Sequence, residues 1–502
     1  MGRMGVICMG EMYKQNWKKK DSLEEVMAIF RSSADFIQYD TNAKETKYWI
    51  SYFRTLVDTN ILQQSILKPI NQETWKRLDE LKNMLPVEDL ILTIDTDVIK
   101  EKVLEGFVMI SLSEYGTPCL LIRAKLNKAR EVTLPEVEFT VVGPKEAFVE
   151  SIESNINMIR KRLPIPSLRV RSLNIGRLTK TKVAVIYIEG IADQENVYTI
   201  WQRVTDIDID QVNDSSFVSQ IISDNTNSPF PQLLDTERPD RVASILSEGK
   251  IAVMVDGSPH VLIGPTTLVE FFASFEDYFL NWMIASFFRL IRLFAVGFSI
   301  LATPIYVATL NYHYELVPTD MLNTLVTSRR EVPLPPLLEA LFLEATIELL
   351  REAGARLPTK VGQTIGIVGG IVIGTASVEA GLTSNILLII VALAALASFT
   401  TPVYKMGNTI RLIRFPFLFF AELYGLLGIS LCFSFIIAHL LRLTSLGRPF
   451  LEPIYPPRLS DLKDAFIRLP FSVMNKRPKQ LRTDDPNRMD EKDSRTNKDI
   501  DE

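Results

Sequence analysis

The chain has 502 residues, of which 47% are hydrophobic and 23% are charged, and its formal net charge is −5. This length allows about two to four domains. The negative net charge disfavours a nucleic-acid-binding protein, which needs a basic stripe. The three Cys and three His lie far apart in sequence and form no zinc or haem spacing. We therefore expect no metal site and no cofactor.

The beginning of the chain gives an expectation about its compartment. Residues 1–10 lack the long apolar run of a signal peptide. Three thiols in so long a chain also fit a reducing environment. We therefore expect the N-terminal region to lie in the cytoplasm.

Residues 1–285 have the pattern of a soluble α/β region. Apolar residues recur with a helical period over 23–32, 73–84 and 146–162. Short apolar runs between turn residues predict strands at 107–111, 119–122, 139–142, 183–188, 251–255 and 261–263.

Two local signals divide and shape this region. Asp256-Gly257-Ser258-Pro259 separates the last two predicted strands and predicts a hairpin with a positive φ near Gly257. Pro164 and Pro166 end the preceding helix. We place the boundary between two α/β lobes there, so that the first lobe covers 1–165 and the second covers 166–285.

Residues 286–441 are much more apolar and predict an α-helical polytopic transmembrane domain. Four segments approach or exceed the ~17–25 residues with which a helix crosses a bilayer. These segments are 287–310, 362–382, 385–401 and 415–441. The remaining residues, 442–502, form a polar tail that we expect on the cytoplasmic side. From about 484 onward this tail is nearly all charge, Asn, Ser and Thr, so we expect it to be disordered.

One segment leaves the topology open. Residues 336–351 have a helical period but carry several glutamates. A fifth span here places Lys405, Arg411 and Arg414 inside, as the positive-inside rule favours, and places the tail outside. An interfacial or re-entrant helix keeps both termini inside. We favour four spans with both termini inside, because three carboxylates on one face are too costly for a lipid-exposed helix.

No motif points to catalysis, so we expect a protein that is not an enzyme. The sequence contains no P-loop, no nucleophile elbow and no dinucleotide-binding glycine pattern. The acidic run from Asp206 to Asp210 lacks the Gly and the later Glu of a calcium loop. Solvated charge is the simpler interpretation of this run.

A ladder of glycines at intervals of four residues is the strongest physical signal. Small residues at this spacing let membrane helices approach closely, either within one subunit or between subunits. The opposite helix face could line an aqueous lumen, with apolar residues that gate by dewetting and a polar mouth, or it could face lipid. The ladder consists of Gly362, Gly366, Gly370 and Gly374, with Gly369 beside it. The opposite face consists of Val361, Ile365, Val368, Val372, Thr375 and Glu379.

An acidic face on the preceding helix fits the same hypothesis. Glu344, Glu348 and Glu352 share one side of a helix, while Glu339 points roughly opposite. In a symmetric oligomer such a face forms rings of negative charge that concentrate cations, an acidic vestibule. Local pairing with neighbouring arginines is the alternative. Near the first span, we expect Arg289 and Arg292 to reach toward lipid headgroups.

Several motifs resemble the A subunit of Ger-type spore germinant receptors. They follow one another in the family's order over roughly residues 140–440. The motifs are Gly143-Pro-x-Glu146, Pro229-Phe-Pro-Gln232, Thr236-Glu-Arg-Pro-Asp240, Asp256-Gly-Ser-Pro259, Glu276-Asp-Tyr278, Arg289-x-x-Arg292, Pro304-x-Tyr306, Val332-Pro-x-Pro335, Arg351-Glu-Ala-Gly-x-Arg-Leu-Pro358 and Gly366-Ile-Val-Gly-Gly-x-Val-Ile-Gly374.

The resemblance implies a subunit of a nutrient receptor in the inner membrane of bacterial spores. Such A subunits are thought to form an oligomeric, nutrient-gated channel for monovalent cations. The implied partners are a transporter-like B subunit that binds the nutrient and a C subunit that is a lipoprotein. One departure is present, because Thr383-Ser384-Asn385 stands where the family commonly has Val-Ser-Pro. The lost proline could change a kink between two spans.

Two other classes of function stay open. A secondary transporter usually carries an inverted repeat of its spans, and no such repeat is visible in the sequence. A membrane-tethered scaffold, whose lobes bind a ligand or a partner protein, would keep its function when the membrane part is replaced by an unrelated anchor.

Overall fold

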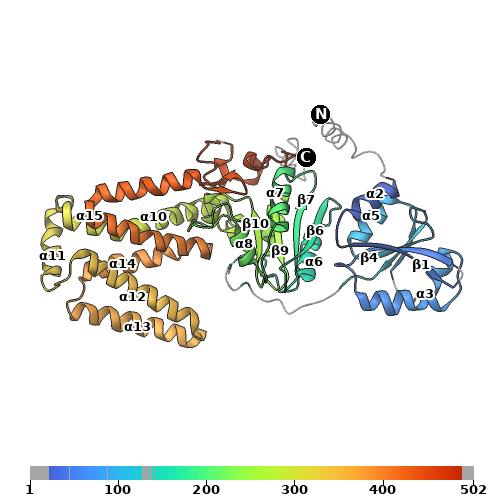
Figure 1. Ribbon diagram of the computed structural model, residues 1–502, viewed down its shortest axis with the longest axis horizontal. Helices are drawn as coiled ribbons and strands as arrows, with labels where there is room; N and C mark the ends of the chain where they lie inside the picture. The colour runs from blue at the N-terminus through green and yellow to red at the C-terminus, as the bar shows by residue number, and fades with distance from the viewer. Residues whose placement is uncertain are drawn as a thin grey trace, which may run out of the picture. The chain divides into compact units, whose positions relative to one another are not determined.

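The computed structural model describes residues 22–488 except 45, 88, 127–134, 136, 137, 139, 141 and 459. The side chains of residues 359–366, 368, 463 and 472 also lie outside the description. The chain divides into two compact units (Figure 1). Unit 1 comprises Met1–Thr226, Leu233–Thr266 and Phe471–Glu502, and unit 2 comprises Asn227–Gln232 and Thr267–Pro470.

The first half of unit 1 is built on a five-stranded antiparallel sheet with the order β1-β2-β4-β5-β3. Strand β4 is buried along its whole length, and helices α2 and α5 pack on the sheet. The elements are α2 (Leu23–Arg31), β1 (Phe36–Ala43), β2 (Thr46–Phe53), η1 (Ile61–Leu67), α3 (Lys68–Gln72), α4 (Leu78–Met84), β3 (Leu90–Thr93), α5 (Thr96–Leu104), β4 (Phe107–Ser111) and β5 (Cys119–Arg123).

The second half of unit 1 repeats this architecture. Its sheet has the order β6-β7-β9-β10-β8, and every pair is again antiparallel. In both halves a helix, a strand pair, further helices, a strand, a helix and a second strand pair follow in that order, which is an internal structural repeat. The elements are α6 (Ile152–Arg162), β6 (Leu168–Ile175), β7 (Thr181–Ile188), α7 (Gln194–Thr205), α8 (Ser215–Ile222), β8 (Leu234–Thr236), α9 (Pro239–Glu248), β9 (Ile251–Val255) and β10 (Val261–Gly264).

Most of the predicted strands of this region are confirmed. The runs at 107–111, 119–122 and 183–188 are β4, β5 and β7, and Gly257 has a φ of 87° in the turn between β9 and β10. The strand predicted at 139–142 falls partly outside the described residues. Two helices begin later than predicted. Helix α4 begins at Leu78, and α6 begins after Ser151, whose hydroxyl accepts from the Ser154 amide as an N-cap.

Helix α6 ends at Arg162, before the two prolines that mark the predicted lobe boundary. The helix packs against β7 and α9, so it belongs to the second sheet. A buried arginine of α6 also joins the two halves of unit 1. Arg160, 1% exposed, donates to the Asp35 carboxylate at 2.5 and 2.6 Å and lies over the Phe53 ring at 4.3 Å. Asp35 also accepts from the hydroxyls of Ser33 and Thr55.

This ion pair predicts a dependence of stability on pH. Burial raises the pKa of Asp35, but the charge and hydrogen bonds of Arg160 outweigh it and hold this pKa below 3.8. The pair therefore contributes stability above about pH 4 and loses it as the pH falls through the lower native pKa. In urea unfolding, we expect wild type to exceed Asp35→Asn by a constant free energy above pH 4, and this difference to shrink below it. Asp208→Asn, which breaks an exposed pair with Arg177, is the control and should change little at any pH.

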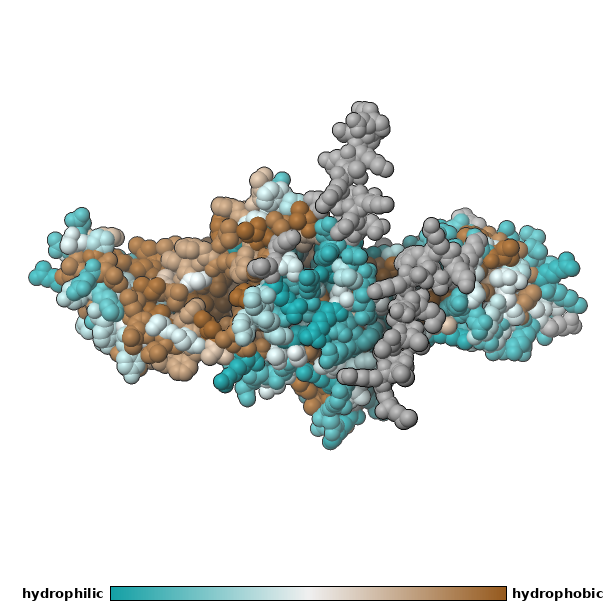
Figure 2. Space-filling view, turned by 90° about the horizontal axis from the view of Figure 1, so that it is seen from above, coloured by the Kyte–Doolittle hydropathy of each residue, from teal (hydrophilic) through white to brown (hydrophobic). Residues whose placement is uncertain are grey.

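Unit 2 is helical. Among the described residues, two helices, α10 and α15, are long and apolar enough to cross a membrane, and α14 is a shorter apolar helix. Large apolar side chains such as Phe294, 74% exposed, cover its surface, and Figure 2 shows this surface in brown. The main helices are α10 (Trp282–Tyr312), α11 (Thr319–Arg329), α12 (Pro336–Arg356), α13 (Thr359–Glu379), α14 (Asn385–Ser398) and α15 (Tyr404–Arg442).

Helix α15 folds back on itself at Gly425. This glycine has φ 61° and ψ −138°, which is not helical. Phe420 and Phe435 have ring centroids 6.5 Å apart, although 15 residues of straight helix would separate them by about 22 Å. Thr409 and His439, on either side of the fold, both bond the segment Asn227–Gln232. We call residues 404–424 the first leg and 426–442 the second leg, drawn in orange and red-orange in Figure 1.

The helices of unit 2 alternate in direction. Ser299 and Asn311 of α10 bond Arg414 and Glu422 of the first leg, so these two helices run parallel. Thr303 bonds Glu344 of α12, and Tyr306 bonds Ser384 at the start of α14, so α12 and α14 run the opposite way. We call the end at which α10 begins proximal and the opposite end distal. In the described part of unit 2, α10, α12, α13, α14 and the two legs of α15 make six passes between these ends.

Candidate functional site

The central feature of unit 2 is an ion pair in its interior. Glu344 of α12 and Arg414 of the first leg are both 2% exposed and contact each other directly. Glu344 accepts from the Thr303 hydroxyl at 3.2 Å, and Arg414 donates to the Ser299 hydroxyl at 2.7 Å. Arg414 also donates to the Ala394 carbonyl of α14 at 3.4 Å. One charged pair therefore holds four helices together.

The other two glutamates of the predicted acidic face also have arginine partners. Glu348 lies 2.8 Å from Arg351 and 3.5 Å from Arg411. Glu352 pairs with Arg356 at 2.5 Å on an exposed surface. The local pairing that the sequence left as an alternative is therefore present at both positions. Glu344 differs from them because it faces the interior of the bundle.

A fourth glutamate, Glu339, lies at the distal end and was placed on the opposite face by periodicity alone. It is 0% exposed and accepts from the Thr383 hydroxyl at 3.2 Å and the Ser384 amide at 2.6 Å. Arg329 of α11 is 3.6 Å away. Ser384 is the N-cap of α14 and Asn385 its first residue. Proline is readily accommodated at that position, so replacing it by Asn changes the first turn and creates no kink inside a helix.

A second charged cluster lies at the proximal end. Asp277, 1% exposed, accepts from Arg289 at 3.0 Å and from Arg292 at 2.6 Å. Arg289 also pairs with Asp464 at 3.0 Å, and the Tyr278 hydroxyl donates to Asp464 at 2.5 Å. The beginning of α10 is thus bound to residues that precede it and to the segment that follows α15.

This cluster corrects the prediction that Arg289 and Arg292 reach toward lipid headgroups. The Arg289 side chain is 2% exposed and that of Arg292 is 14% exposed. Their carboxylate partners are Asp277, just before the helix, and Asp464, in the segment that follows α15. The sequence alone could not place Asp464 beside α10. The nearby motif Glu276-Asp-Tyr278 was a usable signal, because it offers a carboxylate twelve residues before Arg289.

Helix α13 carries the predicted glycine ladder and the predicted pore face. A Cβ at Gly369 would lie 2.8 Å from Leu350 of α12, and one at Gly374 would lie 3.9 Å from Leu388 of α14. A Cβ at Gly370 would meet nothing within 4 Å among the described residues. Part of the ladder therefore packs within the chain and part of it is open. The structure does not describe the surroundings of Gly362 and Gly366, nor the side chains of Val361, Ile365 and Val368.

The described members of the pore face lie on the surface of unit 2. Val372 is 56% exposed, and Thr375 and Glu379 are also exposed. The Thr375 hydroxyl donates to the Ile371 carbonyl one turn earlier, which is how a hydroxyl is accommodated on an apolar helix. The three side chains form a continuous strip that ends in a carboxylate.

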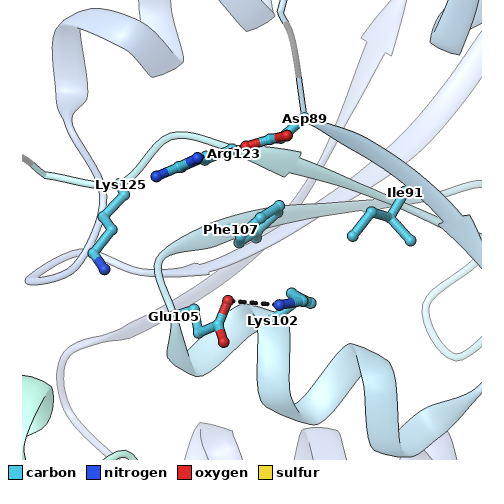
Figure 3. A pocket seen from close by; sticks show the side chains of 7 residues that line it. All are labelled: Asp89, Ile91, Lys102, Glu105, Phe107, Arg123 and Lys125. Carbon is cyan, nitrogen blue, oxygen red and sulfur yellow. Dashed lines mark hydrogen bonds and ion pairs between the residues drawn. The ribbon is translucent and has the colours of Figure 1, made fainter.

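A pocket of about 270 Å³ lies in the first half of unit 1 (Figure 3). Four of the charged side chains that line it form two pairs, Arg123 with Asp89 at 2.5 Å and Lys102 with Glu105 at 2.8 Å. The hydrogen bond to Glu105 raises the pKa of Lys102, so this amine stays charged at neutral pH. No sequence signal marked these residues. The residues that the structure describes hold no cluster of three His, Cys, Asp or Glu able to bind a metal.

Comparisons with known proteins agree on one family. The chain is 52% identical over 457 residues to spore germination protein GerQA of Bacillus cereus, covering 91% of this chain and 92% of that protein. It is 38% identical to spore germination protein A1 of Bacillus subtilis (strain 168), and this match covers 92% of this chain and 95% of that protein.

A solved structure of a domain is also similar. The crystal structure of the N-terminal domain of the A subunit of the Bacillus megaterium spore germinant receptor GerK3 is 30% identical, with a TM-score of 0.37. The match covers 49% of this chain and 95% of that one. The model of the Bacillus/Clostridium GerA spore germination protein family matches residues 24–480. This chain therefore belongs to the GerA family of spore germination proteins.

Proposed function

We propose that this chain is the channel-forming A subunit of a nutrient receptor and that copies of it release monovalent cations across the inner spore membrane. The observation that carries the proposal is the strip formed by Val372, Thr375 and Glu379 on α13. The exposed Glu379 carboxylate supports this, because a charge on an exposed face of an apolar helix is costly unless that face meets water. In a ring of subunits, Val372 would form an apolar constriction that closes by dewetting.

The proposed topology has six membrane crossings, with the N-terminal region and the C-terminal segment both cytoplasmic. The passes other than α14 contain 17 or more residues and so reach about 25 Å or more, against about 30 Å for the hydrocarbon core. The three glutamates that opposed a span, Glu344, Glu348 and Glu352, each pair with an arginine. Glu339, on the opposite face, lies 3.6 Å from Arg329. Pairing removes most of the cost of a carboxylate in a membrane helix. Lys405 then lies at the cytoplasmic, proximal end, as the positive-inside rule favours.

The proposed assembly is a homo-oligomer that works with a transporter-like B subunit and a lipoprotein C subunit. Nutrient recognition is assigned to the B subunit. The open part of the glycine ladder, including Gly370, would pack against a neighbouring copy. Glu348 and Glu352 remain the candidates for an acidic vestibule, because their side chains are 34% and 66% exposed. Glu344 serves the interior of the bundle instead.

The test replaces Val372 by threonine, which keeps the shape and adds a hydroxyl. We expect Val372→Thr to release potassium without nutrient, because a polar constriction stays wet. Ile371→Thr is the matched control, since Ile371 is 62% exposed on the same helix but points about 100° away. Potassium efflux is measured from spores that contain equal amounts of each assembled receptor. Unchanged efflux in Val372→Thr, with and without nutrient, contradicts the pore role.

A further inference from the structure

We infer that the segment Asn227–Gln232, here called the coupling loop, transmits movement of the α/β unit to the two legs of α15. The inference rests on the proposed function, because it states how movement of the α/β unit would reach the helices of the channel. The loop belongs to unit 2 although the residues on both sides of it, Thr226 and Leu233, belong to unit 1. It connects α8 to β8, so both of its ends are fixed to elements of the second sheet half. A displacement of that half must pull on the loop.

The loop contacts both legs at their proximal ends. The Thr409 hydroxyl of the first leg donates to the Pro229 carbonyl at 2.5 Å. The His439 ring of the second leg lies 2.8 Å from the Ser228 hydroxyl and stacks on the Phe230 ring at 5.9 Å. Phe230 is 8% exposed, and its ring lies against a side chain of the second leg.

The loop is also fixed beyond the second leg. The Ser445 hydroxyl donates to the Gln232 carbonyl at 2.6 Å, and Gln232 is 3% exposed. Partners on the first leg, on the second leg and just after it thus hold four of the six residues of the loop. A six-residue loop held at four positions has little freedom to move independently of its partners.

The geometry of the two legs allows the loop to change the distance between their proximal ends. Their distal ends are joined at Gly425, whose backbone conformation is open to glycine and strained for other residues. Because the distal ends are joined, the two legs can move relative to each other mainly by changing the distance between their proximal ends. The first leg also carries Arg414, which holds the four-helix ion pair. A shift of the first leg therefore acts directly on the interior of the bundle.

The first arm of the test measures the legs alone. Spin labels at Tyr404 and Leu441, both exposed, report the proximal separation by double electron–electron resonance in the full chain in lipid nanodiscs. We expect Phe230→Ala to shift or broaden this distance distribution, and Thr409→Val and His439→Phe to do so less. Ser430→Ala is the control, because the Ser430 hydroxyl bonds Leu427 of its own leg. Distributions identical to wild type in all three variants overturn the inference.

The second arm measures the response of the assembled receptor in spores to serial dilutions of nutrient broth. We expect Phe230→Ala to raise the broth concentration for half-maximal potassium release by about 5- to 150-fold, the usual range of a coupling between sites. An unchanged half-maximal concentration at equal receptor abundance overturns the inference. If the channel proposal itself fails, potassium release is absent for reasons that the nanodisc measurement does not share, so the two failures are separable.

Discussion

Replacing Arg414 by methionine is expected to cost the helical unit about 3–5 kcal/mol of unfolding free energy. The substitution leaves the Glu344 carboxylate, 2% exposed, with the Thr303 hydroxyl but without its charge partner. It also removes the hydrogen bond to Ser299 of α10. An unpaired charge in a low-dielectric interior is among the few single changes of this size. The measurement is equilibrium unfolding of the full chain in mixed micelles, together with the amount of folded protein in the membrane.

Two further variants separate the charge effect from the loss of the side chain. Glu344→Met combined with Arg414→Met is expected to recover most of the loss, because replacing both members of a buried pair by apolar residues is often neutral or better. The hydroxyls of Ser299 and Thr303 can turn to carbonyls of their own helix. Arg356→Met breaks the exposed pair with Glu352 and should cost about 0–1 kcal/mol. If Arg414→Met costs no more than Arg356→Met, the buried pair does not hold the bundle.

The α/β part of the fold was predictable where a strand is buried on one or both faces. The runs at 107–111 and 183–188 are apolar throughout and became β4 and β7, and Gly257 fixed a hairpin. The repeat of the two sheets was not predictable, because it is a repeat of strand order with no visible repeat of sequence. Strand order depends on which strands pair across long loops, and no local pattern encodes it.

The helical part shows a second limit of periodicity. The segment 415–441 has the length and apolarity of one span, yet the chain reverses inside it at Gly425. A single glycine in an apolar run is common, and the contacts that require it come from Tyr312 and His313, more than 100 residues earlier. In the proposed topology, the fold of α15 also places Lys405 and the C-terminal segment at the same end of the bundle. A topology inferred from spans alone could not include it.

The candidate site was predictable in its residue types and only partly in its partners. Periodicity placed Glu344, Glu348 and Glu352 on one helix face, and this face does meet arginines. Glu348 and Glu352 meet arginines of their own helix, whereas the partner of Glu344, Arg414, depends on the packing of α12 against the first leg. Charge alone could therefore not distinguish Glu344, which is buried in the bundle, from Glu352 on the surface. The physical reason is that helical periodicity gives the direction of a side chain from the helix axis. It does not tell whether another helix or the surface lies in that direction.

The reversal of α15 gives the second large effect. A Cβ at Gly428 would overlap the carbonyl oxygen of Phe420, which is backbone of the opposite leg and cannot rotate away. A Cβ at Gly425 would lie 3.0 Å from Tyr312 and His313, in a backbone conformation that costs other residues about 1–3 kcal/mol. We expect Gly428→Ala and Gly425→Ala each to lower the unfolding free energy by about 1–3 kcal/mol or more. Both should also increase the distance between spin labels at Tyr404 and Leu441.

Gly297→Ala is the matched control for these variants. Gly297 lies inside α10, where an added Cβ would meet nothing within 4 Å among the described residues, so alanine should be neutral or slightly stabilising. The contrast isolates the approach of two backbones from the general effect of replacing a membrane glycine. If Gly428→Ala behaves as Gly297→Ala does in both measurements, the legs do not approach at Gly428 and α15 is a single straight helix. The proximal ends of the legs would then be about 55 Å apart, and the coupling loop could not contact both.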